Sequence, residues 1–180
     1  HLFACKYPKL VHSATLLSTD TAITNHWTSH YLKMRSQLPC SREKILLHLS
    51  YQLFGRELSK KYPVFTSLLA KCLDNEYILG SIASQINLGI LKGSDIPTLV
   101  INGHDDFVID RMTQARWGEQ LKPGDHYRSI ENARHFFQHK EANQTAAVIE
   151  SFLDMVPEEE TNNSVTIKSK YLPTKISKND

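Results

Sequence analysis

Two short polar loops carry the residues of this sequence that are best suited to chemistry. The first, Gly-His-Asp-Asp-Phe-Val-Ile at 103–109, follows an apolar run, and so does the second, Glu-Asn-Ala-Arg-His-Phe-Phe at 131–137. A carboxylate such as Asp106 can hold one nitrogen of an imidazole such as His135, which leaves the other nitrogen free to take a proton from a nucleophile. The two residues are therefore candidates for the acid and the base of a hydrolytic site.

The other polar side chains of the first loop have weaker cases. Asp105 is the alternative acid, while Asp110 is better placed to cap the helix that follows. His104 has no partner that the sequence can name, so we expect it to be an ordinary polar surface residue. An isolated aspartate after a strand is more often a turn former than a catalytic group. The argument for Asp106 therefore depends on its pairing with His135.

Strands and helices alternate around both loops. The short apolar runs at 96–103 and 127–130 predict strands, and each is followed by helical spacing, at 111–121 and at 142–155. This order predicts parallel strands joined by crossover helices, with the two loops at the carboxyl ends of the strands, where ligands bind in open sheets. The apolar face of the second helix is predicted to comprise Val148, Ile149, Phe152 and Leu153.

The first half of the chain predicts one more strand and several helices. A helix end stopped by Pro8 is predicted first, and then a buried strand over 10–17. Helical spacing follows over four segments, 26–38, 42–54, 64–73 and 77–91. Ser41 is the expected N-cap of the second segment. The buried stripe of that helix is predicted to comprise Leu46, Leu49, Leu53 and Phe54.

Several segments together resemble one family, the α/β-hydrolases. Ile-Pro-Thr-Leu-Val-Ile-Asn-Gly-His-Asp-Asp-Phe-Val-Ile at 96–109 is similar to that family's seventh strand and acid loop, where a glycine precedes the catalytic acid by three positions. Asn-Ala-Arg-His-Phe-Phe at 132–137, with the helix after it, is similar to the histidine loop and final helix. The opening of the chain resembles the helix after the nucleophile elbow and the sixth strand. The resemblance implies that Asp106 is the catalytic acid and His135 the catalytic histidine.

The resemblance also implies a division of the chain. We expect the C-terminal part of an α/β-hydrolase sheet, with three parallel strands, crossover helices and an inserted helical cap. Aromatic side chains of the cap, Trp27, Tyr31, Tyr51 and Phe54, either line an apolar pocket or pack between helices. The expected parts are hydrolase core over 1–20, helical cap or lid over 21–94, core with both loops over 95–157, and a disordered polar tail over 158–180.

No nucleophile is expected within these residues. The strand-to-helix motif G-x-S-x-G is absent, and Gly80-Ser81 and Gly93-Ser94 have the wrong spacing and no preceding strand. By the resemblance, the nucleophile precedes His1. We therefore expect the isolated chain to be inactive, and to depend for folding on a partner or on the segment that would cover its exposed sheet.

The resemblance implies a serine-type hydrolase, similar to lipases and esterases, that cleaves a carboxylic ester, or an amide, through an acyl-enzyme. An aspartate as nucleophile would instead make an epoxide hydrolase or dehalogenase. A third alternative is a non-catalytic pseudohydrolase or truncated product that acts by binding. It stays open because the nucleophile motif is absent and because Arg134 stands where the family usually has glycine before the histidine.

The composition argues against other classes of function. Twenty-one basic and 19 acidic residues leave a net charge of +2, too little for a nucleic-acid-binding surface. Cys5, Cys40 and Cys72 form no C-x-x-C pair, which indicates free thiols rather than zinc ligands or disulfides. No apolar run approaches the roughly 20 residues of a spanning helix. We expect a cytoplasmic protein without stable membrane insertion, metal or organic cofactor, whose partner is a small-molecule ester or acyl substrate.

Overall fold

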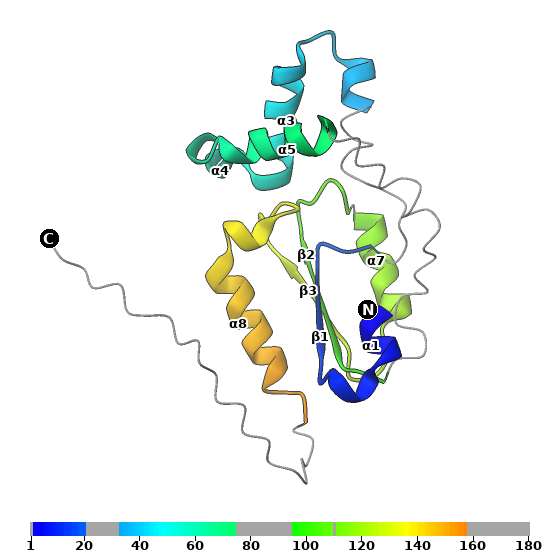
Figure 1. Cartoon of the computed structure of the whole chain (residues 1–180). Helices are drawn as coiled ribbons and strands as arrows, with labels where there is room; N and C mark the ends of the chain where they lie inside the picture. Colours follow the sequence, from blue (N-terminus) through cyan, green and yellow to red (C-terminus); the bar gives the residue numbers. More distant parts are fainter. Residues whose placement is uncertain (1, 21–32, 75–94, 110, 158–180) are drawn as a thin grey trace, which may run out of the picture.

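The computed structural model describes residues 2–20, 33–74, 95–109 and 111–157, and in them a three-stranded parallel sheet. Its strands are β1 (Ala14–Leu17), β2 (Thr98–Gly103) and β3 (His126–Ile130), in the order β1-β2-β3. Each pair of neighbouring strands is parallel. The predicted sheet of parallel strands with crossover helices is therefore confirmed (Figure 1).

Helices cover both faces of the sheet. On one face lies α8 (Ala142–Leu153), and on the other lie α7 (Arg111–Gln120) and α1 (Leu2–Lys6) (Figure 1). All six residues of β2 are buried because this strand is central and covered on both faces. Side chains alternate along it. Leu99 and Ile101 pack into the cluster that includes Phe152 of α8, while Val100 packs with Trp117 of α7.

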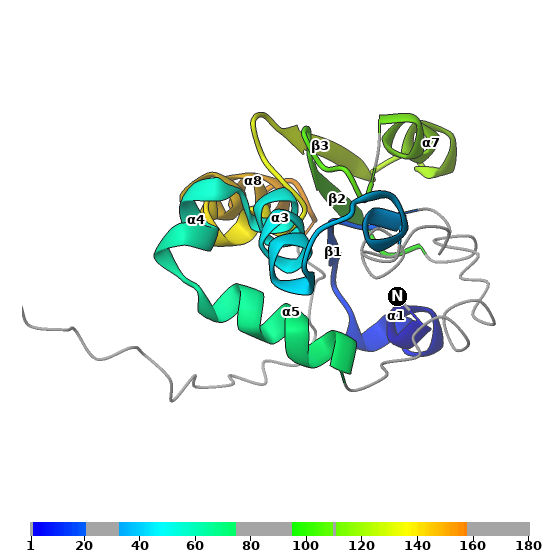
Figure 2. The same cartoon turned by 90° about the horizontal axis from the view of Figure 1, so that it is seen from above.

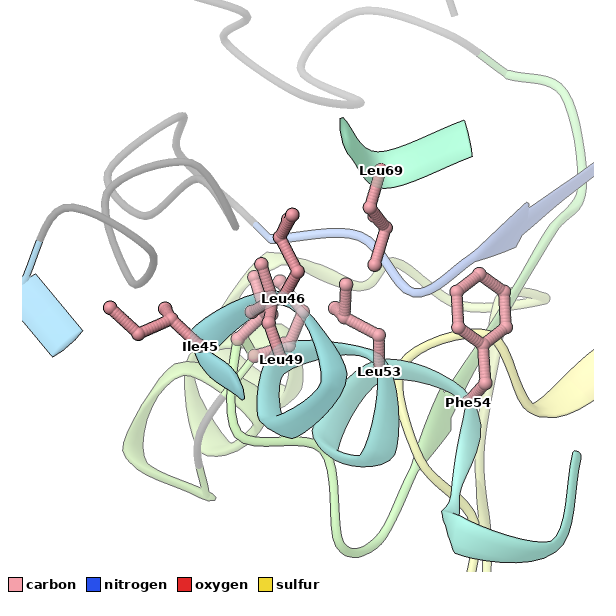
Figure 3. Close-up of a cluster of buried hydrophobic side chains, with 8 residues drawn as sticks. Ile45, Leu46, Leu49, Leu53, Phe54 and Leu69 are labelled. Carbon is pink, nitrogen blue, oxygen red and sulfur yellow. The ribbon is translucent and has the colours of Figure 1, made fainter. Parts of the chain in front are cut away.

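Three further helices lie beyond the carboxyl ends of the strands: α3 (Arg42–Phe54), α4 (Arg56–Lys61) and α5 (Val64–Asp74). Viewed from above, α3 lies nearest the strands and α5 on the outer side (Figure 2). The Ser41 hydroxyl accepts a hydrogen bond from the Lys44 amide at 3.4 Å, so the predicted N-cap is confirmed. The predicted stripe of α3 is buried, and Leu69 projects from α5 toward it (Figure 3).

The first strand is shorter than predicted. The expected strand over 10–17 is paired only from Ala14, and a 3-10 helix, η1 (Pro8–Leu10), precedes it. Proline at the first helical position favours this turn, because its φ is fixed and its missing N–H has no partner to lose. Leu10 is 73% exposed and all residues of β1 are only half-buried, so the prediction of a buried strand is wrong.

One helix was not predicted, and one prediction about a helix face is corrected. Gly55, with a φ of 86°, ends α3, and the short α4 that begins at Arg56 was not expected. Such a φ is easy for glycine alone, so the chain can change direction between the two helices. Leu153 was placed on the apolar face of α8 but is 46% exposed, whereas Phe152 is buried.

Several predictions lie outside the described residues. The helix predicted over 26–38 is described only from Lys33, and residues 33–37 of it are helical. Not described are the helix predicted over 77–91, the Asp110 cap, the side chains of Trp27 and Tyr31, and the tail over 158–180.

Candidate active site

The structure brings Asp106 and His135 together. His135 Nδ1 lies 2.8 Å from Asp106 Oδ2, and the side chains are only 11% and 0% exposed, respectively. The Asp105 carboxylate instead lies 3.3 Å from His104 Nδ1. Of the two neighbouring acids, Asp106 is therefore the one in contact with the histidine.

The second oxygen of Asp106 is held by its own loop. Asp106 Oδ1 accepts hydrogen bonds from the backbone amides of Val108 at 2.8 Å and Ile109 at 3.1 Å. Amide donors stabilise the charged form of a buried carboxylate and fix its orientation. Because Oδ1 is used in this way, Oδ2 is the oxygen presented to His135.

Gln114 of α7 supports both ends of the acid loop. Its Nε2 donates to the carbonyl oxygens of Gly103 at 3.0 Å and Ile109 at 2.9 Å. Its Oε1 accepts from the Tyr127 hydroxyl at 2.9 Å, and burial raises the pKa of Tyr127, so this donor keeps its proton. Sequence reasoning missed Gln114. The available signal was a polar side chain one helical turn from Trp117, on the buried face of the helix.

Gly103 allows the acid loop and the histidine loop to touch. A Cβ at this position would lie 2.4 Å from the carbonyl oxygen of Ala133 and 2.5 Å from that of Arg134. These atoms are backbone, so they cannot rotate away as a flexible side chain would. This contact is a physical reason for a glycine three positions before the acid. The Asp105 amide donates to the Ala133 carbonyl at 3.0 Å beside it.

The histidine loop is also held by segments far away in the sequence. The Phe136 amide donates to the Leu53 carbonyl at the end of α3, at 3.0 Å. The Ser18 hydroxyl, just after β1, donates to the carbonyl of His135. Neither contact was predicted, because neither leaves a local pattern in the sequence.

Helix α3 is part of this site. Val108 and Ile109, the residues whose amides bind Asp106, are buried in one cluster with Leu49 and Leu53 of α3. The rings of Phe54 and Phe136 stack at 4.8 Å between centroids. Helix α3 therefore packs on both loops, and displacement of this helix would disturb the acid and the histidine together.

A cavity of about 580 Å³ lies between helices α3 and α4 and the histidine loop. Its walls come from the end of α3, the start of α4 and residues 132–141, and they include Tyr51 and Phe54. Both aromatic residues line this cavity together with charged side chains such as Arg56 and Glu141, so it is not the purely apolar pocket of one alternative. Phe54 also packs in the α3 cluster, as the other alternative had it. Asp106 and His135 are not among the residues that line this cavity.

His104 and Arg134 have partners that the sequence did not indicate. His104 Nδ1 lies 3.3 Å from Asp105 Oδ1 and 3.4 Å from Glu131 Oε2, and the sequence named neither partner. Arg134 Nη1 donates to the Asp105 carbonyl at 3.3 Å, and its side chain is exposed. The Arg134 side chain of the histidine loop therefore binds the backbone of the acid loop.

Further features concern the described residues alone. No group of three or more His, Cys, Asp or Glu side chains there could hold a metal ion. Cys40 and Cys72 are free thiols. None of the helices in these ranges has both the length and the apolar character needed to cross a membrane.

Solved structures with the same arrangement of elements include several hydrolases. A thermophilic esterase superposes with a TM-score of 0.65 at 16% identity, over 85% of this chain and 60% of that one. For the naproxen esterase of Bacillus subtilis the TM-score is 0.57 at 16% identity, over 84% and 54%. For the enol-lactonase of Burkholderia xenovorans LB400 it is 0.54 at 15% identity, over 84% and 60%. The chain has the α/β-hydrolase fold. The resemblance seen in the sequence is thereby confirmed at the level of the fold.

Two sequence relatives are longer than this chain. An uncharacterized protein of Nostoc sp. is 30% identical over 137 residues, which are 76% of this chain and 54% of the relative. One of Synechocystis sp. is 24% identical over 166 residues, or 92% and 66%. No family model matches. The chain spans about half to two thirds of the length of these curated relatives.

Proposed function

We propose that the full-length protein is a serine hydrolase that cleaves carboxylic esters, with His135 as general base and Asp106 as the acid that orients it. The observation that carries the proposal is the buried 2.8 Å contact between His135 Nδ1 and Asp106 Oδ2. The two residues follow adjacent parallel strands of an α/β-hydrolase fold, at the edge where such sheets bind ligands.

The geometry supports a defined division of roles. Asp106 accepts the Nδ1 proton of His135, so Nε2 is the nitrogen left to take a proton from the serine hydroxyl. The serine oxygen then attacks the ester carbonyl. His135 returns the proton to the departing alcohol, which leaves an acyl-enzyme. Water activated by the same nitrogen releases the acid. Throughout, the two amides on Asp106 Oδ1 hold the carboxylate in place, so that Oδ2 stays directed at the imidazolium.

The nucleophile belongs to sequence outside these 180 residues in this proposal. The G-x-S-x-G motif is absent here, and the chain covers 60% of the similar esterase and 54% of the Nostoc relative. Two of the structures similar to this chain are named esterases, which favours an ester as the substrate. A nucleophilic aspartate at the serine position would direct the same pair of residues to an epoxide or a haloalkane.

The test is turnover of p-nitrophenyl esters by the full-length protein and matched pairs of variants. We expect His135→Ala and Asp106→Asn to lower kcat by about 10³- to 10⁴-fold. The controls are His139→Ala, an exposed histidine four positions later, and Asp105→Asn, the acid that contacts His104. Both controls should stay within about twofold of wild type, with thermal melts that show the fold is intact.

Three results would contradict parts of the proposal. Unchanged ester turnover in a folded His135→Ala variant would remove the catalytic role of the histidine. Turnover of epoxides or haloalkanes without ester cleavage would replace serine by aspartate. A fluorophosphonate label that mapped to a serine within residues 1–180 would place the nucleophile in this chain.

A further inference from the structure

We propose that Ser18 is a positioning residue for His135, an inference that rests on the proposed function. The Ser18 hydroxyl donates a hydrogen bond to the backbone carbonyl of His135, across 117 positions of sequence. Ser18 directly follows the last residue of β1, and its amide donates to the Ile101 carbonyl of β2 at 2.9 Å. Its hydroxyl therefore joins the carboxyl end of the sheet to the residue that carries the imidazole.

The backbone of Ser18 is held in a conformation that L-residues rarely adopt. Its φ is 49°, and among the described residues only Ser18 and Asn132 combine a positive φ with a side chain. Asn132 lies in the histidine loop, three positions before His135. Left-handed geometry costs a residue with a Cβ about 1–2 kcal/mol, and such positions gather at functional sites. One such position thus lies on each of the two segments that the Ser18 hydrogen bond joins.

The residue after Ser18 is fixed by two fully buried side chains. The Thr19 amide donates to Asn102 Oδ1 at 3.1 Å, and the Thr19 carbonyl accepts from Asn102 Nδ2 at 3.3 Å. The same carbonyl accepts from the Trp117 indole at 3.0 Å. Asn102 and Trp117 are each 0% exposed. The Ser18 hydroxyl therefore belongs to a segment that is hydrogen-bonded to both β2 and α7.

His135 is held at three points by different parts of the fold. Asp106 holds its ring, Ser18 holds its carbonyl, and Leu53 of the cap accepts the amide of the next residue. Loss of the Ser18 contact frees the backbone of His135 on the side of β1. Small displacements of a catalytic group lower the rate of the chemical step. We therefore expect an effect on kcat and little effect on KM.

The decisive experiment compares Ser18→Gly with Ser18→Thr in the full-length protein. Glycine lacks the hydroxyl but tolerates the left-handed φ, so kcat should fall about tenfold or more while the melting temperature changes little. Threonine keeps the hydroxyl but is β-branched, so it should lower the melting temperature and keep kcat within about threefold of wild type. If Ser18 were a purely structural residue, kcat and the melting temperature would change in parallel in the two variants. Ser36→Ala is the control, because that exposed hydroxyl also donates to a backbone carbonyl, that of Lys33 at 2.8 Å.

A second measurement separates this inference from the proposed function. The proton between His135 and Asp106 gives a low-field NMR signal that the His135→Ala variant should lack. In Ser18→Gly we expect this signal to broaden or shift, and in Ser36→Ala we expect it unchanged. An unaltered signal together with unaltered kcat in Ser18→Gly would overturn the role of Ser18. A protein without esterase activity in which the signal still responds to Ser18→Gly would overturn the proposed function alone.

Discussion

The acid loop and the histidine loop present their catalytic candidates side by side, yet they are held in opposite ways. The acid loop is held mainly by neighbours in sequence: Asp106 binds amides two and three positions later, and Gln114 binds the carbonyls of Gly103 and Ile109. The histidine loop is held by Ser18 after β1 and by Leu53 in α3. The acid is thus oriented largely by local structure, and the histidine by the assembled fold.

This difference explains where the pair is vulnerable. Disorder at the end of β1 would release His135 first, because Ser18 binds the backbone of the histidine loop. The acid loop would keep its local hydrogen bonds as long as α7 stays on the sheet. Local opening in proteins follows such differences in support, and hydrogen exchange can resolve them.

The largest effect is expected where the two loops touch. Gly103→Ala would place a Cβ 2.4 Å from the Ala133 carbonyl oxygen, so one loop must move. We expect a loss of about 4 kcal/mol in the free energy of unfolding and a loss of activity. Urea denaturation measures the change in the free energy of unfolding. The matched control is Gly118→Ala in α7, where a Cβ meets nothing within 4 Å and helix propensity should stabilise the protein by up to about 1 kcal/mol.

A somewhat smaller effect is expected in α3, and it should reach both loops. Leu49→Ala removes a fully buried side chain from the cluster that contains Val108 and Ile109. The expected cost is about 3 kcal/mol, with faster exchange of the amides in both loops. Leu47→Ala, on the same helix but 40% exposed, should stay within about 0.5 kcal/mol. Equal losses in the two variants would mean that α3 does not support the site.

The smallest effect is expected from a variant that should change the acid loop and leave the histidine loop nearly unchanged. Gln114→Ala leaves two carbonyls and the Tyr127 hydroxyl without this partner, at a cost of about 2 kcal/mol. Amide exchange should accelerate at Val108 and Ile109 and change little at Phe136. Gln120→Ala, an exposed residue of the same helix, is the control. Equal acceleration in both loops would show that the acid loop is not supported independently.

Much of the fold could be predicted because it follows from local patterns. The apolar periodicity of α3 and its Ser41 cap predicted the helix from Arg42 to Phe54, and the order of strands and helices predicted a parallel sheet. The beginning of β1 could not be predicted. Residues 10–13 are apolar enough for a strand, and only the pairing of Ala14 beside Pro97 decides where the ladder starts.

The same division holds for the candidate site. The sequence by itself determined that Asp106 and His135 follow successive strands in the order a hydrolase needs, and that a glycine precedes the acid by three positions. Only the tertiary structure decided that Asp106 rather than Asp105 faces the histidine, that His104 contacts Glu131, and that Ser18 and Leu53 hold the histidine loop. The physical reason is the distance along the sequence between the residues that interact. Periodicity, helix caps and turns arise from residues a few positions apart, whereas these contacts join segments that only the packing of the whole sheet and its helices brings together.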